Sequence, residues 1–304
     1  MHKLQRIVVG LDLDPEGGAL TAGSRAAARQ ALWLAKRTGA RVDFLHSTWA
    51  HPEEDRPTQA ERPAEAEQQV EALRAEFGVG VGASGLVLTE ERPWVALTRR
   101  VLAGEADLVV VAKRNHTRRD DRKLGSVSMK LVHTCPGAVW VVKPEHDFEH
   151  GCVVAATDLT AVGDLAVEYG AFVAEAEDSA LCVVHAWQMP LDLQLSAARL
   201  GDAETGRRKE EIADAARRHI RALPFVERLG ERVKVFAACD SPSHAIASLV
   251  AEKDPHLVVM GTISREGIAG WLVGNTAEKL LYRLDCSLLT VKPDEFVCPL
   301  ALHE

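Results

Sequence analysis

The chain has 304 residues, of which 47% are hydrophobic, and this is enough for two domains of ordinary size that each bury a core. Its formal net charge of −8 argues against general binding to nucleic acid or anionic lipid, because both would repel a net anion. The N-terminal residues lack the apolar stretch of a signal peptide, and no apolar run approaches the roughly 18 to 20 residues that span a bilayer, so we expect a cytoplasmic protein with no membrane partner.

The first half of the chain predicts strands that alternate with helices. Short apolar runs rich in valine predict strands at 6–11, 41–47, 85–89, 108–112 and 138–142. Between the first two strands, the segment 24–38 has alanine and leucine at helical spacing, and Gly39 supplies a stop signal. Strands that are apolar throughout are typical of a parallel sheet covered by helices on both faces.

The second half predicts the same order of elements. The run 153–158 answers 7–12, and the segment 204–223 has helical character before strands at 232–238, 256–260 and 287–291. We therefore predict an α/β fold with two tandem, doubly wound, five-stranded parallel-sheet (Rossmann-like) domains. Ligands of such sheets bind where the strand order reverses, which directs attention to the residues after the first and fourth strands of each half.

An internal repeat supports this division. When the chain is shifted by 149 positions, residues 107–131 lie without a gap on residues 256–280. The same shift pairs Lys143-Pro144 with Lys292-Pro293. We place a first domain at residues 1–146 and a second at 147–304.

A glycine-rich stretch follows the fourth strand of the second half. Gly261, Ser264 and Gly267 come first, and Gly274, Asn275 and Thr276 then open a helix. Small residues let backbone N–H groups approach phosphate oxygens, and a helix N-terminus adds unpaired donors. The stretch therefore predicts an anion site. The ordinary alternative is a turn followed by Asn and Thr as helix caps.

The first half has drifted from this pattern. The aligned positions read Ala112, Asn115 and then Gly125-Ser126, so the spacing is kept while the leading glycines are lost. The basic run 113–123 between them is either a second anion site or a solvated loop that Asp120 and Asp121 partly neutralise.

Other candidate residues have simpler interpretations. The six cysteines are scattered without metal-ligand spacing, so we expect reduced, buried thiols and no metal site. His46 and His185 end equivalent strands, and we expect them to pack there instead of binding metal. Asp12-Leu13-Asp14 is weak evidence for a magnesium site. The segment 187–200 is either a lid over an apolar pocket or a loop packed on the sheet.

Three stretches, GTISREGIAGWLVGNTAEKLL, LLTVKPD and HTCPGAVWVVKP, give the chain a resemblance to the tandem universal stress proteins of the UspE type, over nearly its whole length. The resemblance implies a phosphate loop G-x-x-G, nine residues, G-(S/T/N), in which Ser264 here replaces the second glycine. It implies an acidic residue against the base or ribose, which would be Asp158 and, in the first half, Asp12. It also implies an internal pseudo-dimer with the fifth strands, 139–142 and 288–291, at the contact, in a chain that is a monomer or a homodimer.

These observations predict a stress-response protein that binds an ATP-like nucleotide, with or without magnesium, or a related phosphorylated metabolite, mainly in the second domain. The expected contacts there are Ala156, Asp158, Met260, Gly261, Ser264, Arg265, Gly267, Gly274, Asn275 and Thr276, with Asp12, Gly125 and Ser126 in the first domain. Two alternatives are a scaffold with vestigial loops and a binder of a partly apolar ligand. The common nucleophile-elbow, P-loop and zinc-protease motifs are missing, so we expect no dedicated enzyme and at most slow ATP hydrolysis.

Overall fold

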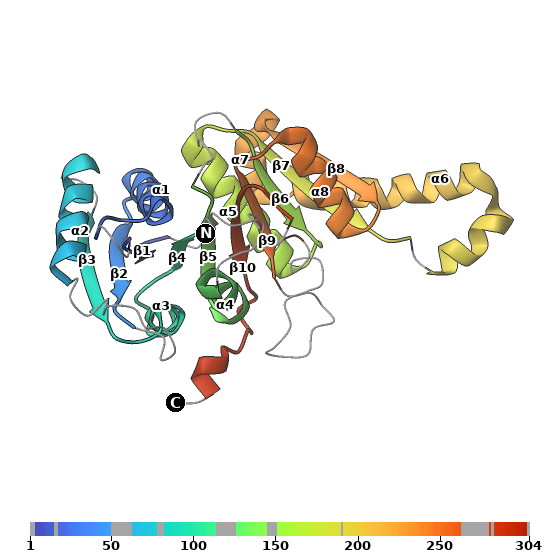
Figure 1. The fold of residues 1–304 in the computed structure, drawn as a ribbon. Helices are drawn as coiled ribbons and strands as arrows, with labels where there is room; N and C mark the ends of the chain where they lie inside the picture. The colour runs from blue at the N-terminus through green and yellow to red at the C-terminus, as the bar shows by residue number, and fades with distance from the viewer. Residues whose placement is uncertain are drawn as a thin grey trace.

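The computed structural model describes residues 4–14, 18–49, 63–77, 82–113, 126–144, 151–189, 191–262, 280 and 283–302. Within this part, ten strands form one continuous sheet in the order β3-β2-β1-β4-β5-β10-β9-β6-β7-β8 (Figure 1). The first half supplies β1 (Arg6–Leu11), α1 (Ala22–Thr38), β2 (Arg41–Ser47), α2 (Pro63–Phe77), β3 (Gly82–Thr89), α3 (Pro93–Leu102), β4 (Leu108–Ala112), α4 (Ser126–Thr134) and β5 (Ala138–Val142).

The second half supplies β6 (Val153–Thr157), α5 (Ala161–Glu177), β7 (Leu181–Trp187), α6 (Leu191–Arg221), α7 (Pro224–Leu229), β8 (Val233–Cys239), α8 (Pro242–Lys253), β9 (Leu257–Gly261) and β10 (Ser287–Val291). Within each half the strands are parallel and follow one order, 3-2-1-4-5 in the first and its counterpart in the second. The predicted tandem α/β fold is confirmed. The predicted boundary at 146/147 falls outside the described residues and stays a prediction.

The two halves join through their fifth strands. β5 and β10 pair antiparallel, with Leu289 opposite Trp140 and Leu288 opposite Val141. Trp140 is fully buried there. The expected contact between the fifth strands is confirmed, and it merges two five-stranded units into one sheet with no edge strand at the join.

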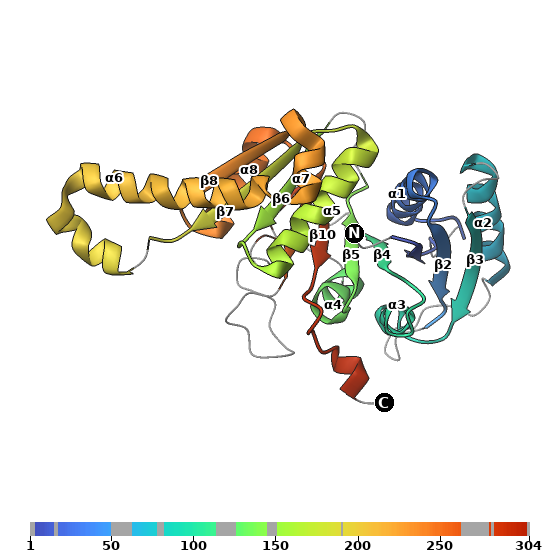
Figure 2. The same cartoon turned by 180° about the vertical axis from the view of Figure 1, so that it is seen from behind.

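Helices cover both faces of this sheet (Figures 1 and 2). Alternate residues along each strand belong to two separate apolar clusters, so that Val153 and Ala155 face one layer and Val154 and Ala156 face the other. The first layer contains α1, α2, α5, α7 and the end of α6, and the second contains α3, α4 and α8. This double cover explains why the strands are apolar throughout.

The same capping residue starts the first helix of each half. Thr21 and Thr160 are the N-caps of α1 and α5, and each side chain accepts a hydrogen bond from the backbone N–H three residues on. The segment from the end of the first strand to this cap is longer in the first half, where Leu13 and Leu20 form an isolated bridge. The repeat thus extends to local hydrogen bonding.

The longest helix, α6, reaches out beyond the end of the sheet in both views (Figures 1 and 2). Its C-terminal half packs against β8, and the buried residues Ala213, Ala216 and Ile220 lie on that face. The helical prediction for 204–223 is confirmed in its main part. The alternative of a loop at 187–200 is wrong from residue 191 onward, because an alanine- and leucine-rich run has high helix propensity. No helix in the described ranges is long and apolar enough to cross a bilayer.

Lysines cross the join between the halves. Lys143 Nζ donates to Asp285 Oδ1 at 2.6 Å and to the Asp285 carbonyl at 3.1 Å. Its repeat equivalent, Lys292, donates to the Val132 carbonyl in the last turn of α4 at 2.6 Å. A cation is favoured at the carbonyl end of a helix. The K-P pairs that mark the repeat therefore fasten each half to the other.

Candidate functional site

The candidate site lies where the strand order of the second half reverses. β6 pairs with β7 on one side and with β9 on the other, and Ala156 lies opposite Met260 in the β6–β9 register. Asp158 and Gly261 follow at the carboxyl ends of these strands, beside the N-terminus of α5. Four of the predicted contacts, Ala156, Asp158, Met260 and Gly261, are thus brought together at the crevice where α/β sheets bind ligands.

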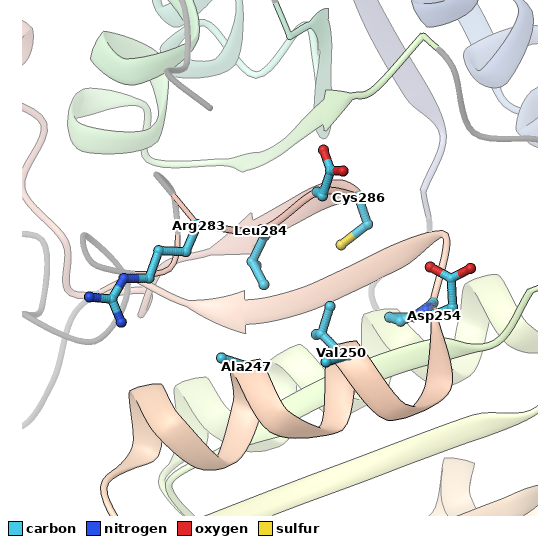
Figure 3. A pocket seen from close by; sticks show the side chains of 9 residues that line it. Ala247, Val250, Asp254, Arg283, Leu284 and Cys286 are labelled. Carbon is cyan, nitrogen blue, oxygen red and sulfur yellow. The ribbon is translucent and has the colours of Figure 1, made fainter. Parts of the chain in front are cut away.

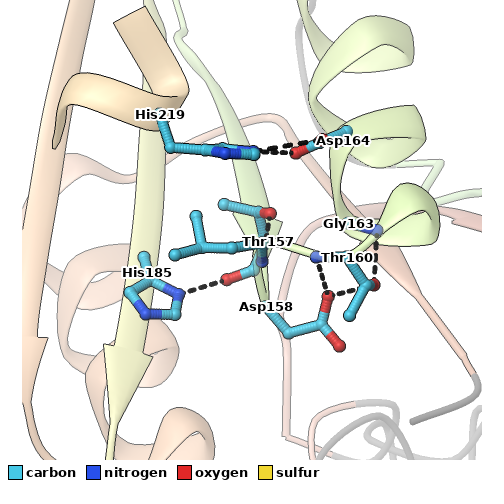
Figure 4. A network of polar contacts seen from close by, with 8 residues as sticks. Thr157, Asp158, Thr160, Gly163, Asp164, His185 and His219 are labelled. Atoms are coloured by element: carbon cyan, nitrogen blue, oxygen red, sulfur yellow. Dashed lines mark hydrogen bonds and ion pairs between the residues drawn. The ribbon is translucent and has the colours of Figure 1, made fainter. Parts of the chain in front are cut away.

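Asp158 has a structural role in this place (Figure 4). Its Oδ1 accepts hydrogen bonds from the Thr160 backbone N–H at 3.1 Å and from the Thr160 hydroxyl at 2.5 Å. Thr160 in turn caps α5 by accepting from the Gly163 N–H. Within the described part of the chain, Oδ2 of Asp158 makes no hydrogen bond, and the side chain is exposed. One carboxylate oxygen therefore holds the turn, while the other is available to a ligand.

The turn around Asp158 requires close backbone packing. Leu159 has a φ of 61°, an unfavourable value for a residue other than glycine. A Cβ at Gly163 would lie 2.5 Å from Thr157 Oγ1 and 2.6 Å from Asp158 Oδ1. Only glycine fits at 163, and backbone strain of this kind is concentrated at functional sites.

Gly261 also has a packing reason. A Cβ there would lie 3.3 Å from Val162 on α5. At the equivalent contact of the first half the small residue is on the helix, where a Cβ at Gly23 would lie 2.8 Å from the Ala112 methyl group. The glycine of this contact is on the strand in the second half and on the helix in the first half. Gly23 on α1 therefore compensates in packing for the glycine that Ala112 replaces on β4.

Thr262 was not among the predicted contacts. It directly follows Gly261, it is 1% exposed, and its hydroxyl has no hydrogen-bond partner in the described structure. Its backbone N–H donates to the Val291 carbonyl at 3.2 Å. A buried, unsatisfied hydroxyl at a strand end is unfavourable by about 1–3 kcal/mol and is a ready donor to a ligand. No local pattern distinguishes it in the sequence from a packed threonine.

The two strand-end histidines are fastened to the backbone. His185 Nδ1 lies 2.9 Å from the Thr157 carbonyl, and His46 Nδ1 lies 3.2 Å from the Leu11 carbonyl, so each imidazole bonds to the last residue of the neighbouring strand. Both are buried. These contacts support the packing interpretation, and no group of three metal-ligating residues occurs in the described ranges.

A further polar contact bounds the site. His219 on α6 lies with its Nε2 2.9 Å and 3.1 Å from the two carboxylate oxygens of Asp164 on α5 (Figure 4). This pair joins the long helix to the helix whose N-terminus faces the site. Sequence reasoning missed it, because the partners are separated by 55 positions and share no periodic pattern.

The first-half counterpart is arranged differently. Asp12 is exposed at the end of β1, and its backbone N–H donates to Ser24 Oγ at 2.7 Å. Leu13 is buried, which separates Asp12 from Asp14 on the surface. Ser126 is the first residue of α4 and is exposed.

The remaining predicted contacts, Ser264, Arg265, Gly267, Gly274, Asn275, Thr276 and Gly125, lie outside the described residues, as does the basic run from 114 to 123. Their roles stay predictions.

Comparison with known proteins identifies the fold family. The model of the universal stress protein family matches this chain twice, over residues 3–143 and 152–292. The chain belongs to the universal stress protein family. Universal stress protein E of Salmonella typhi is 26% identical over 298 residues, covering 91% of this chain and 93% of the relative. Universal stress protein E of Escherichia coli K12 is 25% identical over 300 residues, with the same two shares.

Solved structures agree with this fold. A functionally unknown protein from Pseudomonas aeruginosa PAO1 superimposes with a TM-score of 0.69 at 20% identity, covering 96% of this chain and 94% of that one. A universal stress protein from Archaeoglobus fulgidus gives a TM-score of 0.62 at 17% identity, covering 96% and 99%. A family member from Arabidopsis thaliana, which aligns with 48% of this chain at a TM-score of 0.35, was solved with AMP bound.

The chain described here has a small cavity (Figure 3). The residues that line it include those just before β9 and β10, so it lies at the amino ends of these strands, opposite the candidate site. Its volume is about 270 Å³, and it lies between the end of α8 and the start of β10. The lining is mixed: Val250 and Leu284 are apolar, whereas Asp254 and Arg283 are charged. It is thus separate from Asp158 and Gly261.

Proposed function

We propose that this universal stress protein binds a nucleotide such as ATP, or a related phosphorylated metabolite, at the carboxyl edge of β6 and β9 in the second domain. The observation that carries the proposal is the meeting of Asp158 and Gly261 at the point where the strand order reverses. Family membership of both halves supports it. The stress-response role and the cytoplasmic location are part of the same proposal.

The described residues suit the sugar and base end of such a ligand. Asp158 Oδ2 can accept a hydrogen bond from a ribose hydroxyl or a base amino group. The Thr262 hydroxyl can donate to the ligand once the ligand reaches the end of β9. The phosphate end is assigned to the expected loop residues Gly274, Asn275 and Thr276. Magnesium, if it binds, would arrive with the phosphates, which is its usual mode.

Asp158→Asn tests the proposal more sharply than alanine would. The asparagine Oδ1 can keep both hydrogen bonds from Thr160, so the α5 cap survives, while the free carboxylate oxygen becomes an amide donor. We expect the Kd for ATP, measured by calorimetry with and without Mg²⁺, to rise about tenfold, as for the loss of one charged hydrogen bond. The Tm without ligand should stay the same.

Asp12→Asn, at the equivalent position of the first domain, is the matched control and should leave the Kd unchanged. Nucleotide binding that responds equally to both variants, or no binding of any phosphorylated ligand, would refute the assignment to the second domain.

A scaffold without a nucleotide is the second candidate. It is favoured by the structural roles of Asp158, as a helix-cap support, and of Gly261, as a close contact of Val162. In that case no nucleotide shifts the Tm, and protein partners captured by the wild type persist with Asp158→Asn. In neither case do we propose a dedicated enzymatic activity, and slow ATP hydrolysis belongs only to the nucleotide-binding case.

A further inference from the structure

Two thiols meet at the amino end of the second-domain sheet. Cys152 directly precedes β6, and Cys182 is the second residue of β7. Because Cys182 lies opposite Val154 in the register, strand alternation places both cysteines on the same face. Cys182 belongs to the apolar cluster beneath α8, Cys152 packs against the same cluster, and Cys152 Sγ lies 3.9 Å from the Lys253 carbonyl at the end of α8. Both are free thiols.

The pair is set apart from the other cysteines by its surroundings. The neighbouring Cys152 thiol, helped by the ammonium groups of Lys253 and Lys234, lowers the pKa of Cys182 to about 7, and the Cys182 thiol in turn raises the pKa of Cys152. Because the two thiols interact, the lowered pKa describes the loss of the first proton from the pair. In contrast, burial raises the pKa of Cys135 to about 11.

Access to the pair is through Cys152. Its side chain is half-buried, whereas Cys182 is 2% exposed. Lys253 lies beside the two thiols, with its Nζ 2.6 Å from Glu252 Oε1 and 5.4 Å from the centre of the Phe236 ring. Reactive cysteines occur in such electropositive, partly open surroundings, whereas fully buried thiols are inert.

We propose that Cys152 and Cys182 form a redox-responsive dithiol that a hydroperoxide converts to an intramolecular disulfide. One sulfur, as thiolate, attacks a peroxide oxygen, the O–O bond breaks, and the departing oxygen takes a proton and leaves as water or an alcohol. The resulting sulfenic sulfur is attacked by the second sulfur, its S–O bond breaks, and hydroxide leaves as water with the remaining proton. The two thiols lose two electrons in total, and the peroxide gains them.

The position of the pair indicates a bond that is easily reduced. Cys152 and Cys182 are diagonal neighbours across β6 and β7, so their Cα atoms lie farther apart than those of directly paired residues, and a disulfide between them requires some backbone movement. Cys152 lies outside the β6–β7 ladder, so a small shift of its backbone can close this distance. Disulfides formed under strain have more oxidising potentials and are the regulatory ones.

The test is oxidation of the full-length chain by hydrogen peroxide, followed by mass spectrometry of unreduced peptides. We expect a peptide linked through Cys152 and Cys182 to form at least about tenfold faster than Cys239, an exposed and solitary cysteine, is oxidised. Dithiothreitol should reverse the link. Cys239→Ser serves as the matched control and should form the link at the wild-type rate.

Two variants distinguish a reactive dithiol from cysteines that are oxidised only because they are exposed to solvent. Cys182→Ala should abolish the link. Lys253→Gln, at the surface, keeps both cysteines and removes the nearby ammonium, so it should slow link formation roughly two- to fivefold while the fold stays intact. The proposal fails if Cys239 is oxidised first, if no Cys152–Cys182 peptide forms, or if Lys253→Gln reacts at the wild-type rate.

Discussion

Replacing Lys292 by methionine should remove a pH-dependent part of the free energy of unfolding. Lys292 is 4% exposed at the join between the halves, where its Nζ donates to the Val132 carbonyl and lies 4.9 Å from the centre of the Phe296 ring. The titratable neighbours are the thiols Cys135 and Cys298. Burial lowers the pKa of Lys292 from 10.5 to about 8, because the ammonium is poorly solvated there.

The sign follows from proton binding. Between pH 8 and 10.5 the folded protein releases the Lys292 proton while the unfolded chain keeps it, so the unfolded state binds more protons and the free energy of unfolding rises with pH. A difference of that size, at ~1.4 kcal/mol per pKa unit, amounts to about 3 kcal/mol in full, and about 2–3 kcal/mol of it develops between pH 7 and 10. Well below pH 8 the Lys292 ammonium is charged in the folded protein, and it lowers the free energy of unfolding by the full amount.

Urea unfolding of the wild type and Lys292→Met, measured at pH 7, 8, 9 and 10, tests this. The free energy of unfolding of the methionine variant minus that of the wild type should fall by about 2–3 kcal/mol across the series. Using the difference cancels the thiols, whose raised pKa values act in the opposite direction. Lys292→Arg keeps its charge at every pH tested, so its free energy of unfolding should depend on pH in the same way as that of the methionine variant, at a lower absolute value. Parallel curves for wild type and Lys292→Met would refute the reasoning.

Three further outcomes are expected. Gly163→Ala should lower the free energy of unfolding by about 1–3 kcal/mol in urea, because the new Cβ would overlap Asp158 Oδ1; an unchanged value would mean that the turn relaxes freely. Asp178→Gly, at a C-cap with φ of 54°, should raise the Tm by a few degrees in calorimetry. The relief of backbone strain, about 0.5–1 kcal/mol, outweighs the loss of the exposed ion pair with Arg232, and a lower Tm would contradict this. Trp140→Ala should cost about 3–5 kcal/mol in urea unfolding, because it empties the buried contact with Leu289; a loss below about 1 kcal/mol would show that the join is not part of the core.

Most element positions could be predicted from local patterns, and the errors occurred where those patterns are weak. β3 begins at Gly82, three residues earlier than expected, because Gly82, Ala83 and Ser84 carry no apolar signal. The run from 191 was ambiguous because its leucines fit either a packed loop or a helix. For the site, the structure brings the chosen ends of β6 and β9 together, since carboxyl ends of parallel strands meet at one edge.

The sequence by itself determined that there are two copies of one α/β unit, because apolar runs, helix stops and a repeat of 149 positions are all legible along the chain. Only the tertiary structure decided which distant side chains come into contact. It shows that Asp158 supports a helix cap, that Lys292 reaches α4, and that Cys152 lies next to Cys182. The physical reason is that periodicity records which face of an element is buried, whereas hydrogen bonds between residues far apart in sequence depend on register and packing, which leave no periodic trace.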